Sequence, residues 1–160
     1  MTQAMSPARL PVSIRAFTEA DTDAVLALWL NAFPEYRQPD KPHRDPRLSI
    51  VNKLATQPEL FFVATCSDAI VGTILAGYDG HRGWLYSLAV DPVVRRQGIG
   101  TRLVAHAENA LAERGCPKVN LQVLPGKHEV LGFYEALGYN ADPVLSLGKR
   151  LEAKRPMTVE

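Results

Sequence analysis

The segment from Arg95 to Thr101 carries the residues of this chain that are best suited to hold an anion. Two arginines supply fixed positive charge, and Gly98 and Gly100 have no side chain that would hold a ligand away from the backbone. A helix that starts here leaves about four backbone N–H groups without partners and adds roughly half a positive charge. Together these features predict a phosphate or pyrophosphate site, formed by Arg95, Arg96, Gln97, Gly98, Ile99, Gly100 and Thr101.

A second interpretation of this segment is a plain turn, in which the glycines serve packing and the arginines are solvated. Two known phosphate loops are excluded by the sequence. The Walker loop needs Gly-Lys-Ser/Thr, which does not occur here, and the dinucleotide fingerprint needs a third glycine where Leu103 stands. The double arginine and the strand predicted just before it favour the phosphate site over the packing turn.

A predicted strand and a predicted helix position this loop. Residues 84–90 are mostly apolar or aromatic, as in a buried strand, and Pro92 ends the run because proline cannot donate to a ladder. Gly115 marks the end of the following helix. The apolar face of that helix recurs at three- and four-residue spacing, with Leu103, Val104, Ala107, Ala110 and Leu111.

The first third of the chain predicts a mobile tail over 1–11, a strand over 12–17 and two helices. A capping-box-like start at Thr18 precedes the first helix, which buries Val25, Leu28, Trp29 and Ala32, with Trp29 as a core residue. A proline-broken loop covers residues 33–46. The second helix has Asp45 as its N-cap and Pro46 at its first position, and its apolar face is expected to hold Leu48, Val51 and Ala55.

The remaining chain predicts four more strands and one more helix around the central strand–loop–helix unit. Gly72 and Gly77 are expected to mark bends or close backbone approaches. The fold class is a mixed α/β layer with a parallel pair where the central helix crosses over. We expect one domain over 12–151 and a polar tail over 152–160. The elements are strands at 60–66, 69–78, 119–124 and 144–151, a turn at 79–83 and a helix at 128–137.

Composition limits the classes of function. The 160 residues give one domain a real core, with 46% hydrophobic and 22% charged residues and a formal net charge of +1. This balance gives no reason to expect nucleic acid or a membrane as partner. Two cysteines, Cys66 and Cys116, are too few for a disulfide framework or an ordinary zinc site, so we expect no metal, reduced thiols and a cytoplasmic location. The sequence does not determine the oligomeric state, and a homodimer is one option.

The central loop resembles motif A of the GNAT acetyltransferases, Arg/Gln-x-x-Gly-x-Gly/Ala, through Arg95, Gly98 and Gly100. The preceding Leu88–Pro92 also looks like that family. The resemblance implies a GNAT-like fold from Val12 to about residue 150, with a central, mostly antiparallel sheet and helices on both faces. It further implies acetyl-CoA as cosubstrate, with its pyrophosphate on the loop and its arm against Leu88, Ala89 and Val90.

The segment from Phe133 to Tyr139 resembles motif B of the same family, Tyr-x-x-x-Gly-Phe/Tyr. The resemblance implies that Tyr134 is the acid that donates to the departing CoA thiolate, and that Phe133 lies at the cofactor. The other interpretation is that Tyr134 only packs its helix. Lys127 stands where the family often has an asparagine that holds the cofactor arm, and a lysine there could reach a phosphate instead.

No general base stands out in the sequence. Glu35 or His81 is our candidate, and His43, Asp79 and Glu129 are the other titratable groups considered. The leading hypothesis is an N-acetyltransferase that moves an acetyl group from acetyl-CoA to a primary amine, either a small molecule or a peptide, by direct attack. The alternative is an acyl-CoA-binding sensor or interaction module with little turnover.

Overall fold

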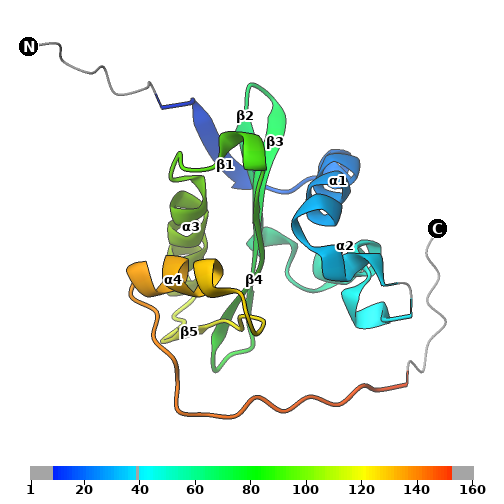
Figure 1. Ribbon diagram of the computed structural model, residues 1–160, viewed down its shortest axis with the longest axis vertical. Coiled ribbons are helices and arrows are strands. Elements are labelled where there is room, and N and C mark those ends of the chain that lie inside the picture. Colours follow the sequence, from blue (N-terminus) through cyan, green and yellow to red (C-terminus); the bar gives the residue numbers. More distant parts are fainter. Residues whose placement is uncertain (1–8, 39, 153–160) are drawn as a thin grey trace, which may run out of the picture. The chain divides into compact units, whose positions relative to one another are not determined.

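The computed structural model describes residues 9–38 and 40–152 (Figure 1). Its contacts divide the chain after Leu121 into two units. The first unit contains the sheet and three helices, and the second contains one helix and an extended segment. Most of the tail expected over 1–11, and nearly all of that over 152–160, lies outside the described residues. The expected single domain over 12–151 stays a prediction.

The first unit is built on a five-stranded sheet whose spatial order follows the sequence. Its first four strands are antiparallel, while the last pair is parallel because a helix crosses over between them. The mixed, mostly antiparallel sheet predicted from the sequence is confirmed. The strands are β1 (Val12–Ala16), β2 (Phe61–Cys66), β3 (Ala69–Tyr78), β4 (Gly83–Val90) and β5 (Val119–Asn120).

Helices cover both faces of this sheet, as predicted. In Figure 1, α1 (Thr22–Ala32) and α2 (Pro46–Thr56) lie on one side of the strands and α3 (Ile99–Glu113) on the other. This explains why the six residues Val71–Ala76 of β3 are all buried, since neither face of the central strand meets water. Short 3₁₀ turns at 19–21, 34–37, 42–44, 58–60 and 92–94 connect the elements.

An aromatic cluster forms the core on the α1 side. Trp29 is fully buried, which confirms its predicted core role, and its ring lies 5.8 Å from that of Phe61. Phe61 in turn stacks on Phe17 at 4.1 Å. The Trp29 indole Nε1 donates to the Thr73 hydroxyl at 2.8 Å, so the one polar atom of this large ring is satisfied in the core.

Several sequence predictions hold and three are wrong. Asp45 caps α2 by accepting from the Arg47 and Leu48 N–H groups, as predicted. The buried face of α2 was misjudged, because Ile50 and Lys53 are buried whereas Val51 is 51% exposed. The strand expected over 119–124 ends at Asn120, and residues 144–151 form no strand. The leucines of that segment alternate with polar residues as they would in a strand, but a strand also needs a neighbouring strand to pair with. These leucines are 85–92% exposed.

The second unit contains α4 (His128–Ala136), close to the helix predicted over 128–137. Gly138 follows its last turn with φ of +93°, a conformation that favours glycine. Within the ranges that the structure describes, no helix is long and apolar enough to span a membrane.

An ion pair joins the end of β1 to the start of α1, and it gives a stability prediction. Arg15 donates to both carboxylate oxygens of Asp21, at 2.7 and 2.8 Å, and holds the pKa of Asp21 at about 2 instead of its usual 3.8. Because the folded pKa is lowered, this stabilisation is present above pH 3.8 and is lost as pH falls through about 2. Asp21→Asn should lower the free energy of unfolding at pH 7 by about 1–2 kcal/mol.

Urea unfolding of this variant and of Asp23→Asn, on the exposed side of the same helix, measures the effect. The gap between wild type and Asp21→Asn should close between pH 4 and pH 2. A gap of the same size at pH 2 would contradict an ionic origin.

Candidate functional site

The loop before α3 has the backbone that an anion site needs. Gly98 is the N-cap residue with φ of +74°, and Arg96 also adopts a positive φ of +66°. The turn entering α3 is closed by the Arg102 N–H, which donates to the Gly98 carbonyl at 3.1 Å. The N–H groups of the preceding helical residues therefore have no intrahelical acceptor and point out of the helix start. Ile99 is only 2% exposed as a whole residue, so it anchors the start of the helix in the core.

Contacts with the sheet hold this loop in place. The Asp91 N–H donates to the Val71 carbonyl at 2.8 Å. The Asp91 carboxylate accepts from the Val93 N–H at 3.0 Å, which forms the short turn after β4. A Cβ at Gly72 would lie 3.0 Å from the Leu103 Cδ1 and 3.1 Å from the Ala89 carbonyl. The close approach predicted at Gly72 is confirmed, and it lets α3 pack directly on β3 and β4.

The predicted cofactor residues of the loop differ in accessibility. Arg95, Arg96, Gly98 and Thr101 are exposed, whereas Gln97 and Gly100 are half-buried. On β4, Ala89 is buried, and Leu88 and Val90 are half-buried. The loop therefore offers charged side chains and backbone N–H groups to solvent while its apolar residues anchor it.

A β-bulge interrupts β4 just before this loop, and nothing in the sequence analysis predicted it. Leu75 of β3 pairs with Tyr86 of β4, and Thr73 pairs with Ala89. Between these two pairs β3 has one residue and β4 has two, so β4 contains one extra residue. Ser87 adopts φ of +52°, in the left-handed region. A bulge leaves an unpaired residue and re-aims the strand, which is why bulges often lie next to functional sites.

Buried side chains brace this bulge. The Thr73 hydroxyl accepts from Trp29 at 2.8 Å and donates to the Ser87 carbonyl at 2.9 Å. The Tyr36 hydroxyl lies 3.2 Å from the Ser87 Oγ. Thr73, Tyr36 and Ser87 were missed because their spacing along the chain carries no signal; only the fold brings them together.

Among the described residues, β5 pairs with only a short part of the outer edge of β4. β5 pairs with β4 only at Gly83 and Trp84, and it ends at Asn120. In the part of the chain that the structure describes, no strand pairs with that edge from Leu85 to Val90. An extended ligand can hydrogen-bond to such an edge, and this one leads directly into the loop before α3.

Tyr134 and its neighbours belong to the second unit. Tyr134 is 6% exposed and forms an aromatic cluster with Phe133, at 5.0 Å, and Tyr139, at 5.5 Å. Burial raises the pKa of Tyr134 to about 12, so the phenol keeps its proton at neutral pH. Lys127 is the exposed N-cap residue of α4. The roles predicted for Tyr134, Phe133 and Lys127 stay predictions.

Comparison with known proteins identifies the family. The model of the acetyltransferase (GNAT) family matches residues 23–139. The chain belongs to this family. An acetyltransferase of Yersinia enterocolitica is 42% identical over 140 residues, which cover 88% of this chain and 96% of that relative. The chain is thus an acetyltransferase, and acetyl-CoA is its cosubstrate.

Two solved structures have the same GNAT fold. The PaiA N-acetyltransferase of Thermoplasma acidophilum, solved with coenzyme A, gives a TM-score of 0.72 at 16% identity and covers 84% of this chain and 93% of its own. An aminoglycoside N-acetyltransferase solved with CoA gives 0.69 at 18% identity and covers 92% and 100%. At these identities the likeness concerns the fold alone.

The candidate bases of this acetyltransferase lie in different surroundings. Glu35 is half-buried on the 3₁₀ turn over 34–37, and His81 is exposed in the turn after β3. Asp79 accepts from the Arg82 and His81 N–H groups, and these bonds lower its pKa, which makes it a poorer base. Glu35 or His81 stays the prediction for this role. Among the described residues, no group of three or more His, Cys, Asp or Glu could hold a metal ion.

The exposed arginines of the GNAT loop give a prediction for CoA binding. Arg95 and Arg96 should add charge more than shape, so the affinity for CoA should fall as salt rises. The double variant Arg95→Ala/Arg96→Ala should bind about tenfold more weakly at low salt and show a flatter salt dependence. Calorimetry at several ionic strengths, with Arg47→Ala as a control for an exposed arginine on α2, measures this. An unchanged salt slope would place both arginines away from the phosphates.

Proposed function

We propose that this enzyme transfers the acetyl group of acetyl-CoA directly to a primary amine. The observation that carries the proposal is the succession of two features: the edge of β4 that β5 leaves unpaired ends at Val90, and the short loop over 91–97 joins it to the helix start at Gly98. The first suits the extended, amide-containing arm of CoA, and the second suits its pyrophosphate. Arg95 and Arg96 would add charge at the phosphates, and Leu88, Ala89 and Val90 would flank the arm.

The bulge gives the reacting carbonyl a place on the same strand. Residues Ser87 and Leu88 lie outside the pairing of β4 with β3, and an unpaired backbone N–H there could donate to the oxygen as negative charge develops. Thr73, which itself accepts from Trp29, donates to the Ser87 carbonyl, and this contact would keep such a donor in position before the reaction. A preorganised donor of this kind is worth about 10²–10³ in rate.

The proposed transfer makes one bond, breaks one bond and moves two protons. The amine nitrogen forms a bond to the thioester carbonyl carbon, the carbon–sulfur bond breaks, and the sulfur leaves as a thiolate. The Tyr134 phenol donates to that sulfur, and the proton lost by the amine passes to Glu35, His81 or water. Tyr134 belongs to the second unit, so its approach to the sulfur is part of the proposal.

Release of free thiol from acetyl-CoA tests the proposal. The purified protein is incubated with acetyl-CoA and a panel of amino acids, peptides, polyamines and other amines, and acetylated products are identified by mass spectrometry. We expect amine-dependent thiol release with one acetylated amine formed for each thiol. Tight CoA binding without thiol release across the panel would instead favour the acyl-CoA-binding sensor.

A further inference from the structure

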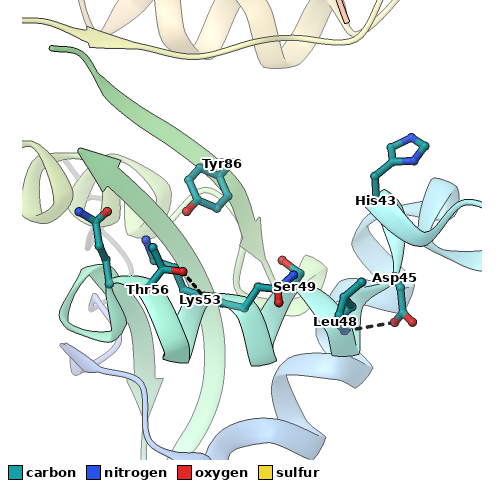
Figure 2. Close-up of a pocket in the computed structure, with 9 residues that line it drawn as sticks. His43, Asp45, Leu48, Ser49, Lys53, Thr56 and Tyr86 are labelled. Atoms are coloured by element: carbon teal, nitrogen blue, oxygen red, sulfur yellow. Dashed lines mark hydrogen bonds between the residues drawn. The ribbon is translucent and has the colours of Figure 1, made fainter. Parts of the chain in front are cut away.

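A cavity of about 310 Å³ lies between α2 and β4, and all of its lining belongs to the first unit. Polar residues of α2 at helical spacing form one wall, and Tyr86 of β4 forms another (Figure 2). Tyr86 directly precedes Ser87 of the bulge, so the cavity opens beside the segment at which we place the acetyl group. Besides the apolar Leu48, the wall contributed by α2 consists of Ser49, Asn52, Lys53 and Thr56.

Lys53 is the distinctive residue of this cavity. Its side chain lies on the buried face of α2 and is 5% exposed, although lysine is almost never this buried without a pairing partner. The ammonium donates to the Ala76 carbonyl, and its nitrogen lies 5.4 Å from the centre of the Tyr86 ring. An ammonium group has three N–H donors, so the Ala76 carbonyl leaves it with further hydrogen-bonding capacity.

Among the described residues, no carboxylate forms a direct ion pair with Lys53. Glu59 is near enough for its charge to raise the Lys53 pKa, but Glu59 pairs with Arg114 at 3.0 Å, and the Arg114 charge acts on Lys53 in the opposite direction. Asp45 also lines the cavity, but its carboxylate caps the helix eight residues earlier, about 12 Å along the axis. Burial lowers the pKa of Lys53 to about 8, which leaves it mostly protonated at neutral pH.

The other polar groups favour an anion over a second cation. Gln57 is engaged with the Tyr78 backbone, because its oxygen accepts from the Tyr78 N–H at 3.0 Å and its nitrogen donates to the Tyr78 carbonyl at 2.9 Å. Ser49, Asn52 and Tyr86, which line the same cavity as Lys53, carry O–H or N–H groups. A buried cation with donors around it is stabilised by one negative charge and is repelled by an amine or polyamine.

We propose that this cavity binds a carboxylate of the acceptor, with the Lys53 ammonium as its counter-ion. The inference rests on the proposed function and narrows its acceptor to an amine that also carries a carboxylate, such as an amino acid or a short peptide. A carboxylate fits better than a phosphate because one negative charge balances one lysine, whereas a phosphate dianion would leave a buried excess charge.

Matched pairs of ligands test the inference. Each amino acid of the panel is compared with its carboxamide and with the corresponding aminophosphonate, by calorimetry in the presence of CoA and by kcat/KM. We expect the acids to bind on the order of 10- to 100-fold more tightly than their amides, the effect of a buried charge-assisted hydrogen bond. The comparison with the amides is the stricter test. Their amino groups are less protonated, so the amides would react faster than the acids if the enzyme did not recognise the carboxylate.

Variants of Lys53 assign the effect to the cavity. Lys53→Met keeps the length of the side chain without its charge, and Lys53→Gln also keeps a donor for the Ala76 carbonyl; both should remove the preference for acids, mainly through KM. Arg47→Met removes a charge from the exposed side of the same helix and should leave that preference intact. Thermal unfolding verifies that each variant is folded.

The two proposals can fail separately. Acids that bind no better than their amides, or a preference that survives both Lys53 variants, would overturn the inference even where thiol release shows acetyl transfer. Tighter binding of aminophosphonates than of carboxylates would overturn it as well. Failure of every amine to release thiol would count against acetyl transfer, while the binding measurements would still decide on the carboxylate.

Discussion

The Gly100→Val variant is expected to lose its affinity for acetyl-CoA by on the order of 10²-fold or more. Gly100 lies in the first turn of α3, where backbone N–H groups have no intrahelical acceptor and Gly98 precedes them in a left-handed conformation. Two methyl groups at this position would hold a phosphate away from those groups. Hydrogen bonds to a charged partner are worth about 1.5–3 kcal/mol each, so losing two of them accounts for the effect.

Folding should not be what fails in this variant. Valine has a better helix propensity than glycine, so the first turn should form at least as readily. Ala105→Val adds similar bulk at an exposed position of the same helix, and it should bind acetyl-CoA like wild type. Calorimetry on the three proteins measures the difference. Equal affinity in wild type and Gly100→Val, with both folded, would remove the loop from the cofactor site.

Local chemistry explains which parts of this GNAT fold could be predicted. Asp45 and Pro46 fix the start of α2 through a side-chain cap and a preset φ, and both effects act within three residues. The ends of β3 match the predicted 69–78, because Ser67 and Asp68 form a tight turn before it and Asp79 one after it. The loop before α3 could be located for the same reason, since its glycines and arginines are adjacent in sequence.

Features that depend on distant residues could not be predicted. The bulge at Ser87 is held by Thr73, Trp29 and Tyr36, which lie up to 58 residues away and form no pattern in the sequence. Lys53 looks like a solvated helix charge, and only the carbonyl of Ala76 and the ring of Tyr86 make it a buried one. The candidate acceptor cavity was missed for this reason, because its walls come from α2 and β4, and Tyr86 lies 30 residues beyond Thr56, the last residue of α2.

Tyr134→Phe is expected to lower kcat on the order of 10²-fold with little change in the affinity for CoA. The substitution keeps the ring, and so its contacts with Phe133 and Tyr139, and removes only the hydroxyl. A group that acts only as the carbon–sulfur bond breaks contributes to the transition state and not to binding, so the loss should appear in kcat and equally in kcat/KM.

The raised pKa of Tyr134 limits the role that its hydroxyl can have in the reaction. A pKa of about 12 keeps Tyr134 protonated throughout the usual assay range, so its ionisation should cause no alkaline loss of activity there. An ordinary thiol has a pKa of about 8.5, so complete transfer of the phenolic proton to the thiolate is uphill. Tyr134 should therefore act mainly by donating a hydrogen bond to the sulfur as its charge develops, an effect of the size seen for one oxyanion donor, about 10²–10³.

Tyr139→Phe is the matched control, because it removes the same atom from the same aromatic cluster. Both variants should lose no more than about 0.5–1.5 kcal/mol of unfolding free energy, the worth of one hydrogen bond, whereas only Tyr134→Phe should lose turnover. The measurement follows the amine panel, with saturating acceptor and single-turnover conditions to separate chemistry from product release. Wild-type turnover in Tyr134→Phe would make this tyrosine a packing residue of α4 and leave the departing sulfur to water or to another donor.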